Sequence, residues 1–228
     1  MYDFDWSSVR PALPFMWDGM KVTLKITVLA MSVGIALGTV IAMVRLSKNR
    51  ALSAFSASYV NLFRSVPLIM VLLWFSLIVP DVIARLFNLS RMANVQVISA
   101  MVAFSLFQAA YYAEIIRAGI QSVKSGQIGA ALALGMTFGQ AMRLVVLPQA
   151  FRNMTPLLLT QTIILFQDTS LVYVMQVRDF FGAANIVGTR DGRQVEMILF
   201  AGAVYFVACF VLSKLVKRWQ ERLRVVAT

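Results

Sequence analysis

The sequence predicts an all-α membrane protein with about five transmembrane helices. Of its 228 residues, 60% are hydrophobic and only 14% are charged, and the mean hydropathy is +0.77. A soluble domain of this length normally carries more charge and fewer apolar residues. The apolar residues also form long runs flanked by basic residues, which indicates a lipid environment rather than a water-excluded core.

Five stretches are long enough to cross the hydrocarbon core, which takes about 20 residues of helix. The second continues through Pro80 and Asp81, and the fourth contains Gln161, Gln167 and Asp168. The acidic start of the chain lacks the basic segment of a signal peptide, so we expect the first stretch to be a retained helix. The predicted spans lie in a single transmembrane domain, 1–228, at residues 22–44, 66–87, 97–116, 156–177 and 195–216.

Glycines and prolines add detail to these spans. Gly34 and Gly38 form a G-x-x-x-G pair in the first span. Such a pair either lets a second helix approach closely or occurs by chance in a membrane helix that tolerates glycine. Pro67 and Pro156 are expected near the starts of spans, where the missing N–H costs little.

Basic residues predict the orientation of the chain. With five spans, the segments 45–64, 117–152 and 213–228 lie on one side and hold thirteen of the 21 basic residues. The other side holds seven of the ten acidic residues. The positive-inside rule therefore predicts an outer N-terminus and an inner C-terminus. The thirteen residues are Arg45, Lys48, Arg50, Arg64, Arg117, Lys124, Arg143, Arg152, Lys214, Lys217, Arg218, Arg222 and Arg224.

Composition also argues against several functions. A net charge of +11 on a soluble protein would indicate nucleic-acid binding, but membrane topology explains it here, and no nucleic-acid partner is expected. The chain has no histidine and one cysteine, Cys209, inside the last apolar run. It also lacks the G-x-x-x-x-G-K-[ST] phosphate loop. We therefore expect no catalytic residue, no metal and no cofactor of its own.

The basic segment between the third and fourth spans, 121–152, is long but does not resemble a flexible linker. Residues 127–136 read as a short helix of small and apolar residues that ends at Gly135. Thr137 is expected to cap a second helix, which Pro148 breaks. Since these helices are not needed for spanning, they must bury themselves on the membrane surface or in a groove of a partner.

This segment resembles the EAA loop of ABC importer permeases, whose pattern is E-A-A-x-x-x-G-x(9)-I-x-L-P. The spacing is complete, but Gly129 occupies the position of Glu and Val145 that of Ile. The segments 63–67, 110–119, 147–150 and 168–171 resemble the polar amino-acid (HisMQ-like) branch of these permeases. The run 59–75 is similar to the glutamate/aspartate import permeases in particular.

The resemblance implies a MetI-like type I importer permease in a bacterial inner membrane, which moves glutamate or aspartate from periplasm to cytoplasm. It implies coupling to a cytoplasmic ATP-binding subunit, which binds the ATP, through residues Gly129, Ala130, Ala131, Leu132, Gly135, Val145, Leu147 and Pro148. Further implied partners are a sister permease or a second copy, membrane lipid and a periplasmic amino-acid-binding protein. That protein docks on segment 178–196 unless the segment is merely a solvated loop.

Polar residues within or next to spans are candidates for the substrate path, since burying them is costly. Glu114 either forms an i,i+3 ion pair with Arg117 or faces a central cavity and takes an α-amino group. Arg64 and Arg117 serve topology or bind a substrate carboxylate. Residues Gln167, Asp168, Thr169 and Ser170 either bond neighbouring helices or border a substrate cavity. In similar permeases a Lys often stands at the Gln167 position.

Two alternatives stay open. A permease of the same family could carry another polar amino acid, such as glutamine. A stand-alone ion channel or secondary transporter would belong to a different class, and it would not need the cytoplasmic loop with EAA spacing.

Overall fold

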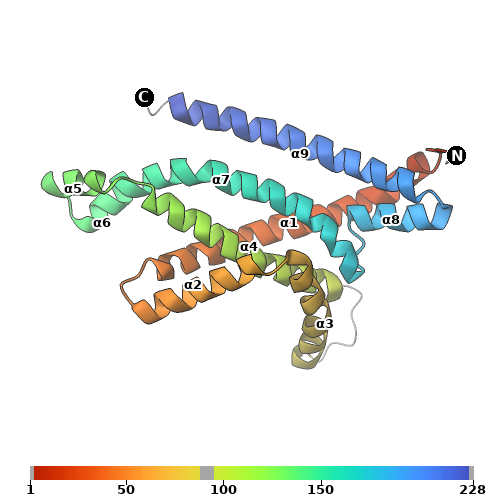
Figure 1. The fold of residues 1–228 in the computed structure, drawn as a ribbon, viewed down its shortest axis with the longest axis horizontal. Coiled ribbons are helices and arrows are strands. Elements are labelled where there is room, and N and C mark those ends of the chain that lie inside the picture. The colour runs from red at the N-terminus through yellow and green to blue at the C-terminus, as the bar shows by residue number, and fades with distance from the viewer. Residues whose placement is uncertain (1–2, 88–94, 226–228) are drawn as a thin grey trace.

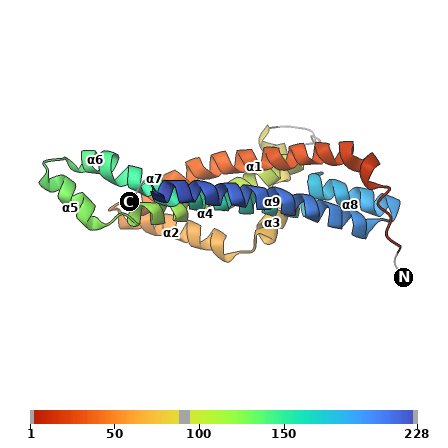
Figure 2. The same cartoon turned by 90° about the horizontal axis from the view of Figure 1, so that it is seen from above.

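The computed structural model describes residues 3–87 and 95–225, and these residues form helices and connecting segments with no strand. Four long helices lie along one axis and form the body of the molecule (Figure 1). They are α1 (Val9–Arg45), α4 (Val95–Gln121), α7 (Leu147–Asp168) and α9 (Gln194–Val225). The short helices α5 (Ser125–Ala133) and α6 (Phe138–Ala141) lie at one end of this body. The helix α8 (Phe180–Asp191) lies at the other end (Figure 2).

Four helical stretches of the described chain are long and apolar enough to cross a membrane: 9–45, 95–121, 138–175 and 194–221. A fifth crossing requires α2 (Arg50–Ser65) and α3 (Leu68–Phe87) to be counted together, and these two helices meet at an angle of 103°. The described chain therefore has about five membrane spans only if the bent pair of α2 and α3 is counted as one span. Residues 45–64, expected to be a basic connecting segment, instead contain α2.

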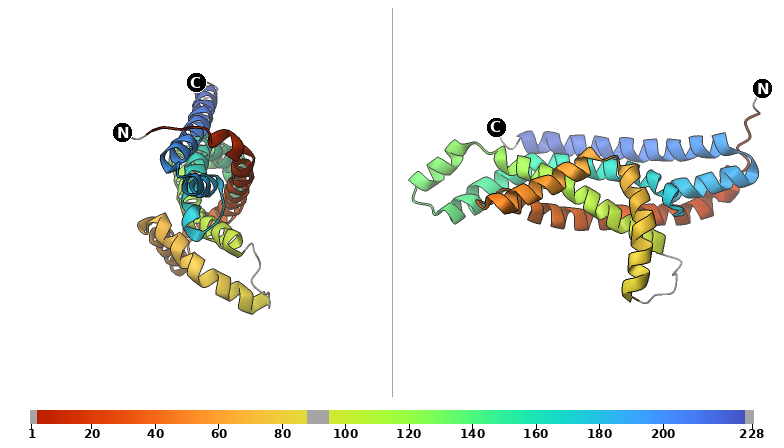
Figure 3. Two further views of the ribbon diagram at one scale, coloured as in Figure 1. Left: turned by 90° about the vertical axis from the view of Figure 1, so that its right-hand side faces the viewer. Right: turned by 60° about the horizontal axis from the view of Figure 1, so that its bottom comes forward.

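The break between α2 and α3 has a local cause. Asn49 caps the start of α2 by accepting hydrogen bonds from the backbone N–H groups of Ala51 (3.0 Å) and Leu52 (3.3 Å). The helix ends before Val66, which is extended because the following Pro67 excludes the helical conformation. Pro67 stands just before α3, as predicted, and α3 projects away from the body of the molecule (Figure 3).

The G-x-x-x-G pair packs α1 against α4 within this chain. A Cβ placed on Gly38 would lie 2.9 Å from the Ala113 nitrogen and 2.9 Å from the Tyr112 Cβ. Gly34 approaches the side chains of Gln108 and Tyr112 in the same way. The close-packing interpretation of this pair is therefore confirmed.

The helix around α7 differs from the prediction at its start. Helix α6 continues through a π-helical turn, Met142–Val146 (η1), directly into α7, so Pro148 does not break the helix. The wider π turn just before Pro148 accommodates a residue that lacks an N–H and crowds the preceding turn. Pro156 also lies inside α7 rather than near its start.

The opposite end of the molecule contains a half-length helix where a polar loop was expected. After α7, the chain forms the 3₁₀ turn Thr169–Met175 (η2), passes Gln176 in the left-handed region (φ 59°), and enters α8. Asp179 caps α8 by accepting from the N–H groups of Gly182 (2.8 Å) and Phe181 (3.2 Å). With 12 residues, α8 is too short to appear as a span in a hydropathy reading.

Candidate functional site

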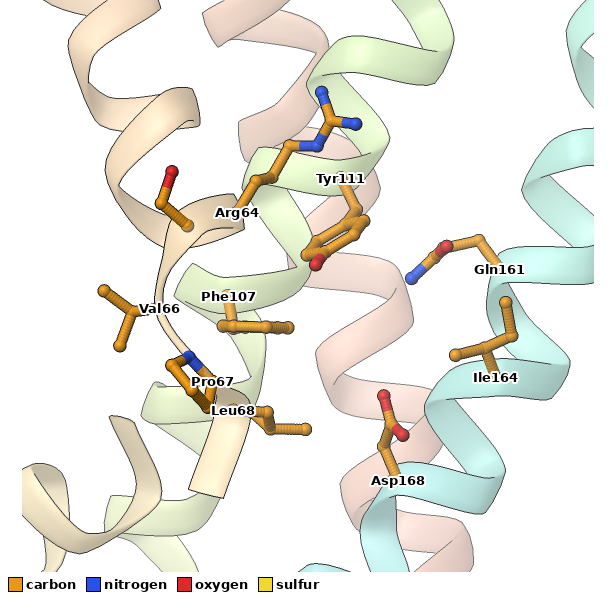
Figure 4. A pocket seen from close by; sticks show the side chains of 10 residues that line it. Arg64, Val66, Pro67, Leu68, Phe107, Tyr111, Gln161, Ile164 and Asp168 are labelled. Carbon is orange, nitrogen blue, oxygen red and sulfur yellow. The ribbon is translucent and has the colours of Figure 1, made fainter. Parts of the chain in front are cut away.

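A cavity of about 380 Å³ lies at the bend between α2 and α3 (Figure 4). The bend forms one wall of the cavity, and α4 and α7 form the other walls. Its lining residues are Arg64, Ser65, Val66, Pro67 and Leu68 from the bend, Phe107 and Tyr111 from α4, and Gln161, Ile164 and Asp168 from α7.

The cavity carries opposite charges at its two ends. Arg64 and Asp168 lie at opposite ends, with Tyr111 and Gln161 between them (Figure 4). The Arg64 guanidinium carbon is 5.6 Å from the centre of the Tyr111 ring, which is within range of a cation–π contact. A site with one cation and one carboxylate at its ends complements a zwitterion such as an α-amino acid.

Gln161 joins the cavity to a buried polar contact between α4 and α7. Its Nε2 donates to Oε1 of Gln108 at 3.0 Å, and Gln108 is fully buried. Next to this pair, the hydroxyls of Tyr112 and Thr162 are 3.0 Å apart. Buried side-chain hydrogen bonds of this kind hold helices in register inside a membrane, where no water competes for them.

Three arginines surround Glu114 beside the cavity. Its carboxylate is 2.5 Å from Arg45, 2.5 Å from Arg117 and 4.0 Å from Arg64. Because Arg45 ends α1 and Arg64 is in the last turn of α2, this cluster ties both helices to α4. The i,i+3 pair with Arg117 is thus present, and Glu114 itself is not among the residues that line the cavity.

The predicted polar segment 167–170 contributes one residue to the cavity. Asp168 lines it, whereas Gln167 is exposed and lies outside the lining. Thr169 is fully buried and donates to the Phe166 carbonyl at 2.6 Å, and Ser170 is half-buried outside the lining. Of the predicted substrate-path residues, the cavity therefore brings together Arg64 and Asp168. Glu114 and Arg117 adjoin it only through Arg64.

The segment with EAA spacing forms a hairpin of α5, α6 and η1. Gly135 has φ +82° and ends α5, and the following Met136 N–H bonds back to the Ala131 carbonyl at 3.1 Å. Thr137 and Gln140 then form a reciprocal capping box that starts α6, which confirms the prediction that Thr137 caps a second helix. These two caps define the turn between α5 and α6, and a small apolar cluster that includes Val123, Val146 and Ala150 packs the base of the hairpin.

The hairpin leaves apolar side chains uncovered. Leu134 is 80% exposed and Phe138 is 64% exposed. Added Cβ atoms at Gly129 and Gly135 would meet nothing within 4 Å. Of the predicted coupling residues, Ala131 is buried, Val145 and Leu147 are half-buried, and the others are exposed: Gly129, Ala130, Leu132, Gly135 and Pro148. An exposed apolar projection of this kind is typical of a surface that another protein covers.

Sequence reasoning missed several residues of these sites. Arg45 had been assigned only to topology, and nothing in the sequence links it to Glu114, which lies 69 positions away. Tyr111 and Phe107 look like ordinary apolar residues of a span. Gln108 and Gln161 carried a signal, because amides inside spans are costly unless they are bonded.

The fold and the sites define the permease subunit of an ABC importer. Residues 34–225 match the model of the binding-protein-dependent transport system inner membrane component, and the chain belongs to this family. It is accordingly an inner-membrane component and a transporter subunit.

Relatives and a solved structure agree with this membership. The glutamate/aspartate import permease protein GltK of Escherichia coli O6:H1 is 60% identical over 97% of this chain and 99% of its own length. The arginine transport system permease protein ArtQ of Bacillus subtilis is 32% identical over 97% of this chain and 98% of its own. A crystal structure of an amino acid ABC transporter with histidines superimposes with a TM-score of 0.86 and 32% identity, covering 97% of this chain and 100% of that chain.

Proposed function

We propose that this chain is the channel-forming permease subunit of an ATP-driven importer that moves glutamate and aspartate from periplasm to cytoplasm. The observation that carries the importer role is the hairpin, which has EAA spacing, has a capping box at its turn and leaves Leu134 and Phe138 uncovered. The acidic substrate rests on the 60% identity, over nearly the full chain, to a protein named for glutamate and aspartate import.

The hairpin couples the permease to a separate ATPase subunit, which binds the ATP, while this chain binds no cofactor. Its exposed glycines and alanines admit close approach of a partner backbone, and its apolar tip fits a groove. Gly129 replaces the Glu of the EAA pattern and supplies no charge there. The hairpin lies at the same end of the molecule as the basic end of α9 (Figure 1), which supports an inner position for both.

The cavity between α3, α4 and α7 is the substrate site. Arg64 pairs with a carboxylate of the amino acid and Asp168 with its ammonium group, while Gln161 and Tyr111 offer hydrogen bonds between them. The excess of arginine around Glu114 adds positive potential on the Arg64 side, which favours a substrate with a second carboxylate.

Two partners complete the importer in this proposal. A sister permease or a second copy pairs with this chain in the membrane. A periplasmic amino-acid-binding protein docks at the opposite end from the hairpin, where α8 and the start of α9 lie (Figure 2). The N-terminus is then outside and the C-terminus inside, as the distribution of basic residues predicts.

The substrate assignment is tested by uptake into vesicles that contain the assembled importer. Unlabelled glutamate and aspartate should compete with labelled glutamate, whereas competition by glutamine alone would move the protein to another branch. Arg64→Gln and Asp168→Asn should reduce uptake and leave assembly intact. Arg50→Gln, an exposed arginine on the same helix as Arg64, is the matched control and should transport normally. Unchanged uptake in Asp168→Asn would reduce that residue to a structural role.

The coupling assignment has its own matched pair of variants. Gly135→Val forces a β-branched residue to φ +82° and should loosen ATPase association or uncouple hydrolysis from uptake. Gly192→Val imposes the same strain at φ +66° at the far end of the molecule and should leave the ATPase attached. Uptake that continues without any ATPase would instead identify a secondary transporter or channel.

A further inference from the structure

An apolar groove runs along α9 on the side of α7 away from the substrate cavity. One hollow of about 630 Å³ lies between α1, α7 and α9, and a second of about 540 Å³ shares Leu159, Leu212 and Val216 with it. The second hollow ends at Arg218 and Trp219. We call the combined feature the α9 groove.

The α9 groove is separated from the cavity by the body of α7. Gln161, Ile164 and Asp168 face the cavity, while Ile163 and Phe166 face the groove. These positions lie on different faces of one helix, as the 3.6-residue period requires. The α9 groove and the substrate cavity therefore share no lining residue and are separate features.

The chemistry of the groove excludes a polar occupant along most of its length. Apart from the indole N–H of Trp17, which is 59% exposed, the polar side chains that line the first hollow are those of Thr27 and Thr162. Both hydroxyls are committed to carbonyls of their own helices, Thr23 and Leu158, at 2.9 Å each. Water or an amino acid would find no partners there, whereas hydrocarbon needs none.

The groove is no longer purely apolar where it reaches Arg218 and Trp219. Trp219 is 48% exposed and Arg218 is exposed beside it, which is the pairing of an aromatic ring and a cation found at membrane interfaces. From Val207 to Trp219 the α9 wall rises about 18 Å. One leaflet of a bilayer core, half of about 30 Å, has nearly the same depth.

We propose that the α9 groove binds an anionic phospholipid, with an acyl chain lying between α1, α7 and α9 and its phosphate paired with Arg218. The apolar length matches a single leaflet, and the basic end complements a negatively charged headgroup. A cationic pocket between membrane helices is the setting in which such headgroups bind. The bound lipid would fill the space that separates α9 from α1.

Native mass spectrometry of the purified importer complex tests this site. The delipidated complex is titrated with phosphatidylglycerol or with phosphatidylcholine. We expect the complex to retain phosphatidylglycerol at a lower lipid concentration than phosphatidylcholine. Arg218→Gln should weaken the binding of phosphatidylglycerol about fivefold, which is the affinity ratio that one interfacial cation supplies. Lys217→Gln removes the same charge from a side chain outside the groove lining, and it should bind as the wild type does.

A second variant tests the groove itself. Ala208→Phe places a ring in the first hollow and should displace both lipids, while co-elution with the ATPase verifies that the variant is assembled. Equal retention of the two lipids, equal losses in Arg218→Gln and Lys217→Gln, or cross-links from Leu212 to a second permease would overturn the proposal. Uptake of glutamate in phosphatidylcholine vesicles reports on the transport function separately.

Discussion

Replacing Glu114 by Gln is expected to destabilise the permease through three separate contacts of graded strength. The Arg45 and Arg117 contacts are 2.5 Å long, and all three side chains are 20–23% exposed. A hydrogen bond to a charged group contributes about 1.5–3 kcal/mol, and partial exposure places these two near the lower value. Arg64, at 4.0 Å and 43% exposed, adds the contribution of a surface pair, about 0.2–1 kcal/mol.

The total for Glu114→Gln is therefore about 3–4 kcal/mol. The loss of stability should be largest for Glu114→Gln, smaller for Arg45→Gln and smallest for Arg64→Gln. The assay is unfolding of the purified permease complex in mixed micelles with increasing sodium dodecyl sulfate, followed by circular dichroism. Arg50→Gln removes an exposed arginine from the same region and should leave the midpoint unchanged.

A double-mutant cycle provides the decisive comparison. If Glu114 and Arg45 interact directly, the combined variant should cost less than the sum of the single variants. Additive losses, or a loss for Arg64→Gln as large as that for Arg45→Gln, would refute the assignment of strength by distance. An unchanged midpoint for Glu114→Gln would refute the role of the cluster altogether.

Three further outcomes follow from individual contacts. Gly38→Ala should cost about 1–3 kcal/mol in the same unfolding assay because its Cβ meets α4 backbone at 2.9 Å, whereas Gly202→Ala, with nothing within 4 Å, should be neutral or slightly stabilising. Thr137→Ala should remove about 1 kcal/mol from the hairpin cap and weaken ATPase association in pull-down, and normal association would show that the cap is dispensable. Burial raises the pKa of Asp179 to about 6, so the folded state holds this proton more tightly than the unfolded state. Stability should then fall as the pH rises from about 4 to about 6, and Asp179→Asn should abolish that slope in unfolding midpoints measured across this range.

Local chemistry made parts of this fold predictable. Gly135 and Thr137 define the hairpin because a left-handed cap and a capping box depend on residues within one turn of each other. The pair Gly34 and Gly38 likewise identified the closest helix contact, since only glycine allows such an approach. These signals need no knowledge of the tertiary structure.

The directions of the helices and the contacts between residues far apart in the chain could not be predicted from the sequence. Hydropathy detects apolar length but not the 103° turn at Pro67, so it predicts a connecting segment where α2 forms. Pro148 was expected to break a helix because a π turn cannot be anticipated from composition. Arg64 and Asp168 were each identified as polar residues near spans, but their meeting in one cavity depends on how α3 leaves the body.

The position of Arg64 explains why the cavity and the Glu114 cluster must be separated by experiment. Among the described residues, Arg64 both lines the cavity and belongs to the ion-pair cluster, whereas Arg45 belongs only to the cluster. Its 4.0 Å separation from Glu114 and its place in the cavity lining allow its guanidinium to take a substrate carboxylate, while Arg45 is bonded to Glu114 at 2.5 Å and does not line the cavity. A stability loss concentrated at Arg45 and an uptake loss concentrated at Arg64 would therefore assign one cation to the architecture and its neighbour to the substrate.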